Sequence, residues 1–258
     1  AAQAADAAMV DDTVAAALAH RPAAPVWPAD AADDPGWDVA LVLDNREVRT
    51  KKDRDYFHRA LEAAGVRTIV RALPLGDMMW VATSAGGAQA EEVEWVCPYI
   101  VERKTAADLR SSIADARYKE QKLRLAECGV PHVVYLVEGR LSLSDHDRKL
   151  RTAMVSTQLH DCGSFRTKQT ADMADSVRWL TLLTRHIQEC VGAFVREQVP
   201  ADGGEARSPA AVEKALSELC AGGGRFEQFK ERASKSKNET VGDLWAKQLV
   251  RIPRISAG

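Results

Sequence analysis

The residues of this chain best suited to chemistry are an acid and a base near its middle, Glu102 and Lys104, separated by one residue. They follow the apolar residues Ile100 and Val101, which predict a buried strand. Alternate side chains of a strand share a face, so Glu102 and Lys104 point one way and Arg103 points the other. The pair is therefore expected at the carboxyl end of a strand, a common place for chemistry in a sheet covered by helices.

Two more acidic positions are expected beside Glu102. Asp44 ends the apolar run VALVL, which is typical of a strand buried on both faces, and Asp77 follows Gly76 near the start of another strand. The strands expected here form a meander of 66–73, 74–84 and 93–104. Asp77 can then lie beside Glu102 on an antiparallel neighbour, and we expect both to converge with Asp44 and Lys104.

Convergent carboxylates predict a site for a hard divalent cation such as magnesium, which prefers oxygen ligands. A metal held in this way orients and deprotonates water and stabilises the charge that develops on phosphorus. Lys104 is placed to steer the attacking water or to neutralise the transition state. The pattern predicts hydrolysis of a phosphodiester.

A helix is expected directly after this strand, because Thr105 and Asp108 have the spacing of a capping box. Asp108 is therefore ranked below the other acids as a metal ligand. Three polar residues of the helix are expected to contact phosphate groups: Arg117, Lys119 and Gln121. The alternative for each is a solvated helix face.

Composition narrows the class of protein. Hydrophobic residues make up 46% of the 258 residues, which is enough for a sizeable core, and no apolar run approaches a membrane span of about 20 residues. The net charge of −2 argues against a protein that coats nucleic acid by bulk charge. The cysteines are odd in number, widely spaced and expected to be reduced core thiols: Cys97, Cys128, Cys162, Cys190 and Cys220.

Composition also divides the chain into four segments. They are a disordered linker over 1–37, an α/β domain over 38–197, a second linker over 198–224 and a last segment over 225–258. A largely apolar helix is expected over 176–195, where a core and a subunit interface are both open interpretations.

The ordered set of motifs resembles one known family. Gly76-Asp77, the tetrapeptide VERK ending at Lys104, and the segment LRSSIADARYKEQKLRL after it resemble the XPF family of structure-specific endonucleases, most closely its Mus-type branch. The similarity covers roughly 39–191. It implies a restriction-endonuclease-like PD-(D/E)xK core, with a mixed central sheet flanked by helices, followed over 225–258 by the start of a truncated helical module of the helix-hairpin-helix type.

The resemblance also implies roles for single residues. Asp44 and Glu47 match acids of the family's first motif, and Asp77 matches its metal-binding aspartate. The catalytic set that the family implies is Asp77, Glu102, Arg103, Lys104 and Asp108, with magnesium as cofactor and manganese as a substitute. Arg103 is expected to pair with a neighbouring acid such as Asp108 instead of touching substrate, and Arg46 is expected to clamp a phosphate or a carboxylate.

What the family does supplies the remaining expectations. They are cleavage of branched DNA at 3′ flaps, replication forks and nicked Holliday junctions, a heterodimer with an EME-type non-catalytic subunit, nuclear location and no membrane partner. Arg254 stands where a hairpin glycine is usual and the chain stops inside the first hairpin, so we expect weak DNA binding and impaired dimerisation of this fragment. The alternatives are a non-catalytic scaffolding subunit, which the intact Asp77, Glu102 and Lys104 disfavour, and an archaeal-type homodimeric nuclease with a fused helicase.

Overall fold

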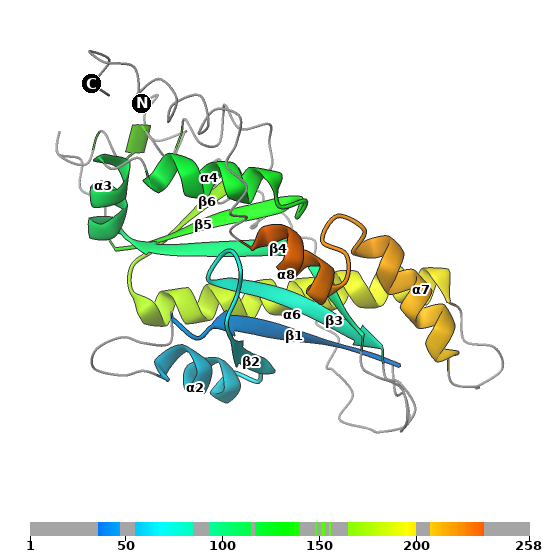
Figure 1. Cartoon of the computed structure of the whole chain (residues 1–258). Coiled ribbons are helices and arrows are strands. Elements are labelled where there is room, and N and C mark those ends of the chain that lie inside the picture. Colours follow the sequence, from blue (N-terminus) through cyan, green and yellow to red (C-terminus); the bar gives the residue numbers. More distant parts are fainter. Residues whose placement is uncertain are drawn as a thin grey trace, which may run out of the picture.

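In the computed structural model, six strands form one mixed sheet within the described part of the chain (Figure 1). The structure describes residues 36–46, 55–84, 93–114, 117–139, 148, 151–152, 155, 165–199 and 207–234. The strands are β1 (Trp37–Asp44), β2 (Thr68–Arg71), β3 (Met78–Ser84), β4 (Glu94–Thr105), β5 (His132–Glu138) and β6 (Phe165–Thr170). The helices are α2 (Tyr56–Ala63), α3 (Ala106–Ala114), α4 (Arg117–Glu127), α6 (Met173–Gln198), α7 (Pro209–Leu219) and α8 (Phe226–Ala233).

The strand order β2-β1-β3-β4-β5-β6 corrects the predicted meander. β1 lies between β2 and β3, parallel to the first and antiparallel to the second. The predicted hairpin of β3 and β4 is confirmed, and β5 and β6 then continue parallel to β4. A strand buried on both faces belongs inside a sheet, which is why the apolar β1 displaces β2 to the edge.

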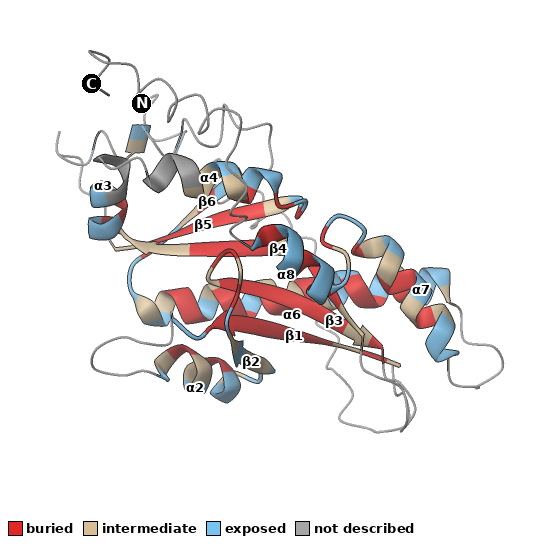
Figure 2. Cartoon of the chain, viewed as in Figure 1, coloured by how far each residue is buried: buried red, intermediate tan, exposed pale blue. Residues whose placement is uncertain are grey.

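Two apolar clusters cover the two faces of the sheet. α2, α6 and α7 contribute to one cluster with β1, while the other contains side chains of α4, α8 and the segment before β3. α6 runs behind the sheet and α8 lies in front of it (Figure 1), and buried residues follow the central strands (Figure 2). The expected mixed sheet flanked by helices is confirmed, and β2 and β6 are its edge strands among the described residues.

The predicted linker over 198–224 is wrong for the part that the structure describes. Residues 209–219 form α7, and Val212 and Leu216 of this helix are fully buried in the cluster of α6. α8 follows with Phe226 and Phe229 buried in the opposite cluster, so both helices belong to the same sheet domain. Residues 1–35 and 235–258, including Arg254 and most of the predicted helical module, lie outside the described residues.

The burial of the thiols agrees with the expectation in part. Cys97, Cys128 and Cys220 are buried free cysteines, whereas Cys190 is exposed on α6. No helix in the described part of the chain is both long and apolar enough to cross a membrane.

Candidate active site

Asp44, Asp77 and Glu102 lie on three adjoining strand ends. The backbone N–H of Asp44 donates to the carbonyl of Asp77 at 2.8 Å, and the N–H of Asp77 donates to the carbonyl of Val101 at 2.9 Å. Glu102 is the next residue along β4, where Val101 faces Met78 of β3. The ends of β1 and β4 therefore meet the start of β3, as the sequence predicts.

The Asp44 carboxylate is buried and surrounded by nitrogen donors. Oδ1 accepts from the backbone N and from Nε of Arg46 at 2.7 and 2.9 Å, and Oδ2 accepts from Nη2 of Arg46 and N of Leu73 at 2.6 and 3.0 Å. Burial raises the pKa of Asp44, but the hydrogen bonds from Arg46 and Leu73 together outweigh it, so its net pKa lies below the usual value. In this arrangement the Asp44 carboxylate holds the Arg46 side chain and the backbone of Leu73 in place through these hydrogen bonds.

Arg46 places a positive charge in direct contact with Asp44 and within the electrostatic influence of Asp77 and Glu102. Its Nη2 also donates to the carbonyl of Leu73 at 2.9 Å. The hydrogen bond to Asp44 raises the pKa of Arg46, burial opposes this, and the charges of Asp44, Asp77 and Glu102 raise it again. Of the two predicted roles of Arg46, the structure shows the carboxylate clamp.

Gly76 sets the path of the chain into Asp77. Its φ is +72°, and a Cβ at this position would lie 2.7 Å from Cγ1 of Ile100 on β4. Glycine tolerates both the left-handed backbone and the close approach. Asp77 is held in turn by Arg103, whose backbone N–H donates to Oδ2 at 2.7 Å.

Glu102 and Lys104 share a face, as predicted. Nζ of Lys104 donates to Oε1 of Glu102 at 3.0 Å, and Glu102 is only 3% exposed. The same oxygen accepts from Nε2 of Gln121 on α4 at 2.5 Å. Gln121, predicted as a DNA contact, therefore lies against the site carboxylate.

Arg103 points to the opposite face of β4 and pairs with Glu138, not with Asp108. Its Nε and Nη2 donate to the two carboxylate oxygens of Glu138 at 3.1 and 2.9 Å. Asp108 instead exchanges hydrogen bonds with Thr105 at 2.7 and 3.1 Å. The capping role that the sequence predicts for these two residues is confirmed.

The remaining predicted residues are not placed in the site. Glu47 lies outside the described residues, and Arg117 and Lys119 belong to α4 without a described side chain. Sequence reasoning missed Glu138 as the partner of Arg103. A usable signal existed, because Glu138 is the acid that ends the apolar strand next to β4.

The carboxylate oxygens at the strand ends are of the kind that binds a hard cation. The described side chains are not, however, arranged as a group of three metal ligands. No set of three or more Asp, Glu, His or Cys side chains among the described residues is arranged to hold a metal ion. The reason at Asp44 is that both oxygens already accept hydrogen bonds from nitrogen. Asp77 and Glu102, on adjoining strands, offer the oxygen chemistry that magnesium prefers.

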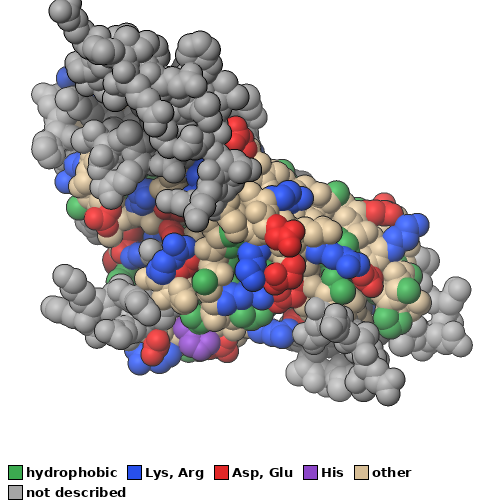
Figure 3. Space-filling view, in the orientation of Figure 1, with side chains coloured by type: hydrophobic (Ala, Val, Ile, Leu, Met, Phe, Trp, Pro, Cys, Tyr) green, Lys and Arg blue, Asp and Glu red, His purple; other side chains and the backbone are tan. Residues whose placement is uncertain are grey.

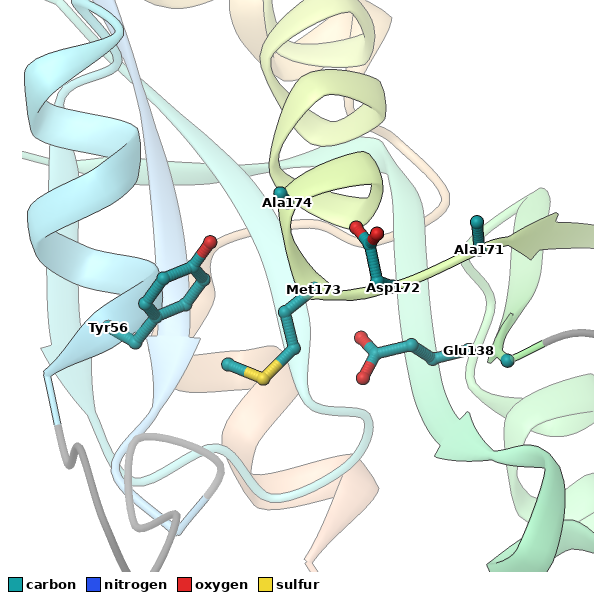
Figure 4. A pocket seen from close by; sticks show the side chains of 7 residues that line it. Tyr56, Glu138, Ala171, Asp172, Met173 and Ala174 are labelled. Carbon is teal, nitrogen blue, oxygen red and sulfur yellow. The ribbon is translucent and has the colours of Figure 1, made fainter.

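A shallow pocket lies away from these carboxylates, on the side of Glu138. Figure 4 shows Tyr56 of α2, Met173 at the start of α6, and the acids Asp172 and Glu138 around it. The pocket includes none of the residues predicted from the sequence. It does open onto the partner of Arg103.

A family model and two similar proteins identify the family to which this chain belongs. The ERCC4 domain model matches residues 43–183, which is more than half of the chain. Crossover junction endonuclease mus-81 of Neurospora crassa is 35% identical over 232 residues, covering 84% of this chain and 35% of that protein. Structure-specific endonuclease subunit MUS81 of Homo sapiens is 36% identical over 228 residues, covering 84% and 40%.

The solved structure of XPF from Aeropyrum pernix in complex with DNA shares 24% identity, with a TM-score of 0.45 over 76% of this chain and 96% of that one. The chain spans between about a quarter and two fifths of the length of the relatives it matches. The family model covers all three strand ends described above, and the chain belongs to the ERCC4 domain family.

Proposed function

We propose that this chain carries the nuclease centre of a metal-dependent endonuclease that hydrolyses phosphodiesters of branched DNA. The observation that carries the proposal is the meeting of Asp77, Glu102 and Lys104 at adjoining ends of β3 and β4. Relatives with about 35% identity are named crossover junction endonuclease and structure-specific endonuclease subunit, which supports this class of reaction.

Asp77 and Glu102 are the residues that would hold magnesium, and manganese would substitute for it. The metal would supply Lewis acidity, lowering the pKa of bound water and stabilising charge on the phosphate. The chain itself orients the ligands, because Arg103 N–H fixes Asp77 while Lys104 and Gln121 fix Glu102. Lys104 also carries a positive charge that favours an anionic phosphate nearby.

The substrates that we propose are 3′ flaps, replication forks and nicked Holliday junctions, in the nucleus. Arg117 and Lys119, on the helix that also carries Gln121, are proposed to contact the DNA backbone. The face shown in Figure 3 mixes lysine and arginine with aspartate and glutamate, so it offers local cationic contacts and no uniform basic surface.

The proposed partner is an EME-type non-catalytic subunit. The buried side of α6 is explained by the core, since Val177, Leu180 and Ile187 pack against the sheet. Its outer side carries Leu182, a large apolar residue that is 44% exposed. This outer side of α6 is the part proposed to meet the partner.

The test is incision of labelled flap and nicked-junction DNA in magnesium, by the full chain with an EME-type subunit. We expect Asp77→Asn and Glu102→Gln to lose cutting by orders of magnitude, while binding to the same DNA persists. Glu94→Gln is the matched control, because Glu94 starts β4 and pairs with Arg71 at 2.8 Å. Retained incision in the Asp77 and Glu102 variants would refute the metal assignment, and DNA binding without incision by the unmodified chain would favour a scaffolding subunit.

A further inference from the structure

Arg103 connects the two faces of β4. Its backbone N–H donates to Oδ2 of Asp77 at 2.7 Å, and its neighbours in the chain are Glu102 and Lys104. Its side chain leaves the sheet on the opposite face, where it binds Glu138. A displacement of Arg103 would therefore move a donor to Asp77 and both residues that flank it.

The contact between Arg103 and Glu138 is a largely buried ion pair with two hydrogen bonds. The side chains are 8% and 11% exposed, and the two N–O distances are 3.1 and 2.9 Å. The guanidinium carbon also lies 4.8 Å from the ring centroid of Phe57 on α2. Paired, low-dielectric geometry of this kind makes the orientation of Arg103 depend on the charge of Glu138.

Glu138 is fixed in turn by the start of α6. The hydroxyl of Ser176 lies 3.0 Å from Oε2 of Glu138 and 2.8 Å from the hydroxyl of Thr170, which ends β6. The backbone N–H of Gly139 donates to the carbonyl of Thr170 at 2.9 Å. Four elements, β4, β5, β6 and α6, thus meet at one carboxylate behind the proposed active site.

We infer that Glu138 is a positioning residue of this active site, acting through Arg103. Its carboxylate accepts hydrogen bonds from Arg103 and Ser176. It holds the Arg103 side chain on one face, so that the backbone of Arg103 presents its N–H to Asp77 and sets Glu102 and Lys104 on the other. The inference rests on the proposed nuclease function.

The variant Glu138→Gln tests the inference, because glutamine keeps the shape of the side chain and removes its charge. We expect kcat for flap cleavage by the full chain with its partner subunit to fall about 10- to 100-fold, with KM for the flap unchanged. Arg103→Gln should show the same loss. The double variant Arg103→Gln, Glu138→Gln should be no worse than either single variant, because the two residues act as one unit.

The control removes a carboxylate from an ion pair elsewhere on β4. Glu94→Gln breaks the pair of Glu94 with Arg71, whose side chains are 22% and 28% exposed. It should leave kcat unchanged. A kcat of Glu138→Gln equal to that of the unmodified chain, or losses in the double variant that multiply, would overturn the inference.

A readout without DNA separates positioning from the nuclease proposal. Mn²⁺ is titrated into the folded chain, and binding is followed by the paramagnetic signal of the free ion. We expect Glu138→Gln to weaken Mn²⁺ binding several-fold. Glu94→Gln should leave Mn²⁺ binding unchanged. Absence of cutting by the unmodified chain would refute the nuclease, whereas equal Mn²⁺ affinity of the unmodified chain and Glu138→Gln would refute the positioning. Ser176→Ala is the second variant, used if Glu138→Gln does not fold. It keeps both charges and removes only the hydroxyl that contacts Glu138, so it should lower kcat by a smaller factor.

Discussion

At the scale of single residues, the site is defined by which oxygen accepts which donor. Oε1 of Glu102 accepts from both Lys104 and Gln121, whereas both oxygens of Asp44 are engaged by Arg46 and Leu73. The two acids are almost equally buried, at 3% and 1% exposure. The two acids therefore differ in their partners, which are an ammonium and a side-chain amide at Glu102 but a guanidinium and two backbone N–H groups at Asp44.

Gln121→Ala tests whether this residue serves the site or the DNA. Removing one hydrogen bond of about 0.5–1.5 kcal/mol should slow cutting up to about 10-fold, with affinity for flap DNA unchanged. Incision rate and fluorescence anisotropy of labelled DNA measure the two effects. The control is Leu123→Ala on the same helix, whose side chain is 57% exposed. A fall in DNA affinity without a change in cutting would restore the role predicted from the sequence.

The face of the sheet on which each strand residue lies could be predicted well, because successive side chains of a strand alternate between its two faces. Glu102 and Lys104 share a face and Arg103 takes the other, as period two demands. The partner of Arg103 could not be found in this way. Glu138 lies 35 residues away, and its approach depends on the parallel pairing of β4 with β5.

At the scale of elements, the connection from β2 to β3 determines where Asp77 lies. Leu73 in this connection donates to Asp44 and accepts from Arg46, and Pro74 accepts from Nη2 of Arg124 on α4 at 3.2 Å. Gly76 then turns the chain against Ile100. The connection thus touches β1, β4 and α4 before it reaches Asp77.

Gly76→Ala should be more costly than a similar change without a close neighbour. A left-handed non-glycine residue costs about 1–2 kcal/mol, and a Cβ forced against packed atoms adds about 1–3 kcal/mol. Gly65→Ala is the matched control, because Gly65 has φ +77° and a Cβ added there would have no neighbour within 4 Å. Urea unfolding measures both free energies. Equal losses would show that the contact with Ile100 relaxes freely.

The sequence predicts most elements but not their order in the sheet. Apolar runs and capping signals locate β1, β4, α3 and α6, since these depend on neighbours in the chain. The place of β1 between β2 and β3 is a non-local choice, and a meander of consecutive strands misses it. The crossover through α2 makes the parallel pairing of β1 with β2 accessible.

At the scale of the molecule, α7 and α8 close the core on both faces of the sheet. The backbone of Val96 on β4 donates to the carbonyl of Gly224 at 2.9 Å, and a Cβ on Gly223 would lie 2.6 Å from that of Val96. Alanine and glycine are frequent in this stretch, a composition that favours a linker when the sequence is taken alone. Small residues here allow close packing instead.

Deletion of 208–258 should therefore unfold much of the domain, beyond any effect of deleting 235–258 alone. The larger deletion removes Val212, Leu216, Phe226 and Phe229, each fully or almost fully buried. A buried apolar side chain contributes about 1.5–3 kcal/mol, so their sum rivals the whole stability of a domain. Thermal unfolding followed by circular dichroism compares the two proteins, and equal transition temperatures would show α7 and α8 to be dispensable.

Arg124 joins the end of α8 to the connection that precedes β3. Its Nη2 binds the carbonyl of Ala233, the last residue of α8, at 2.9 Å, and the same nitrogen reaches Pro74. The last residue of α8 is thus joined through one side chain to the connection that leads to Asp77. A load applied at the end of α8 would pass through Arg124 to Pro74, in the segment that positions Asp77.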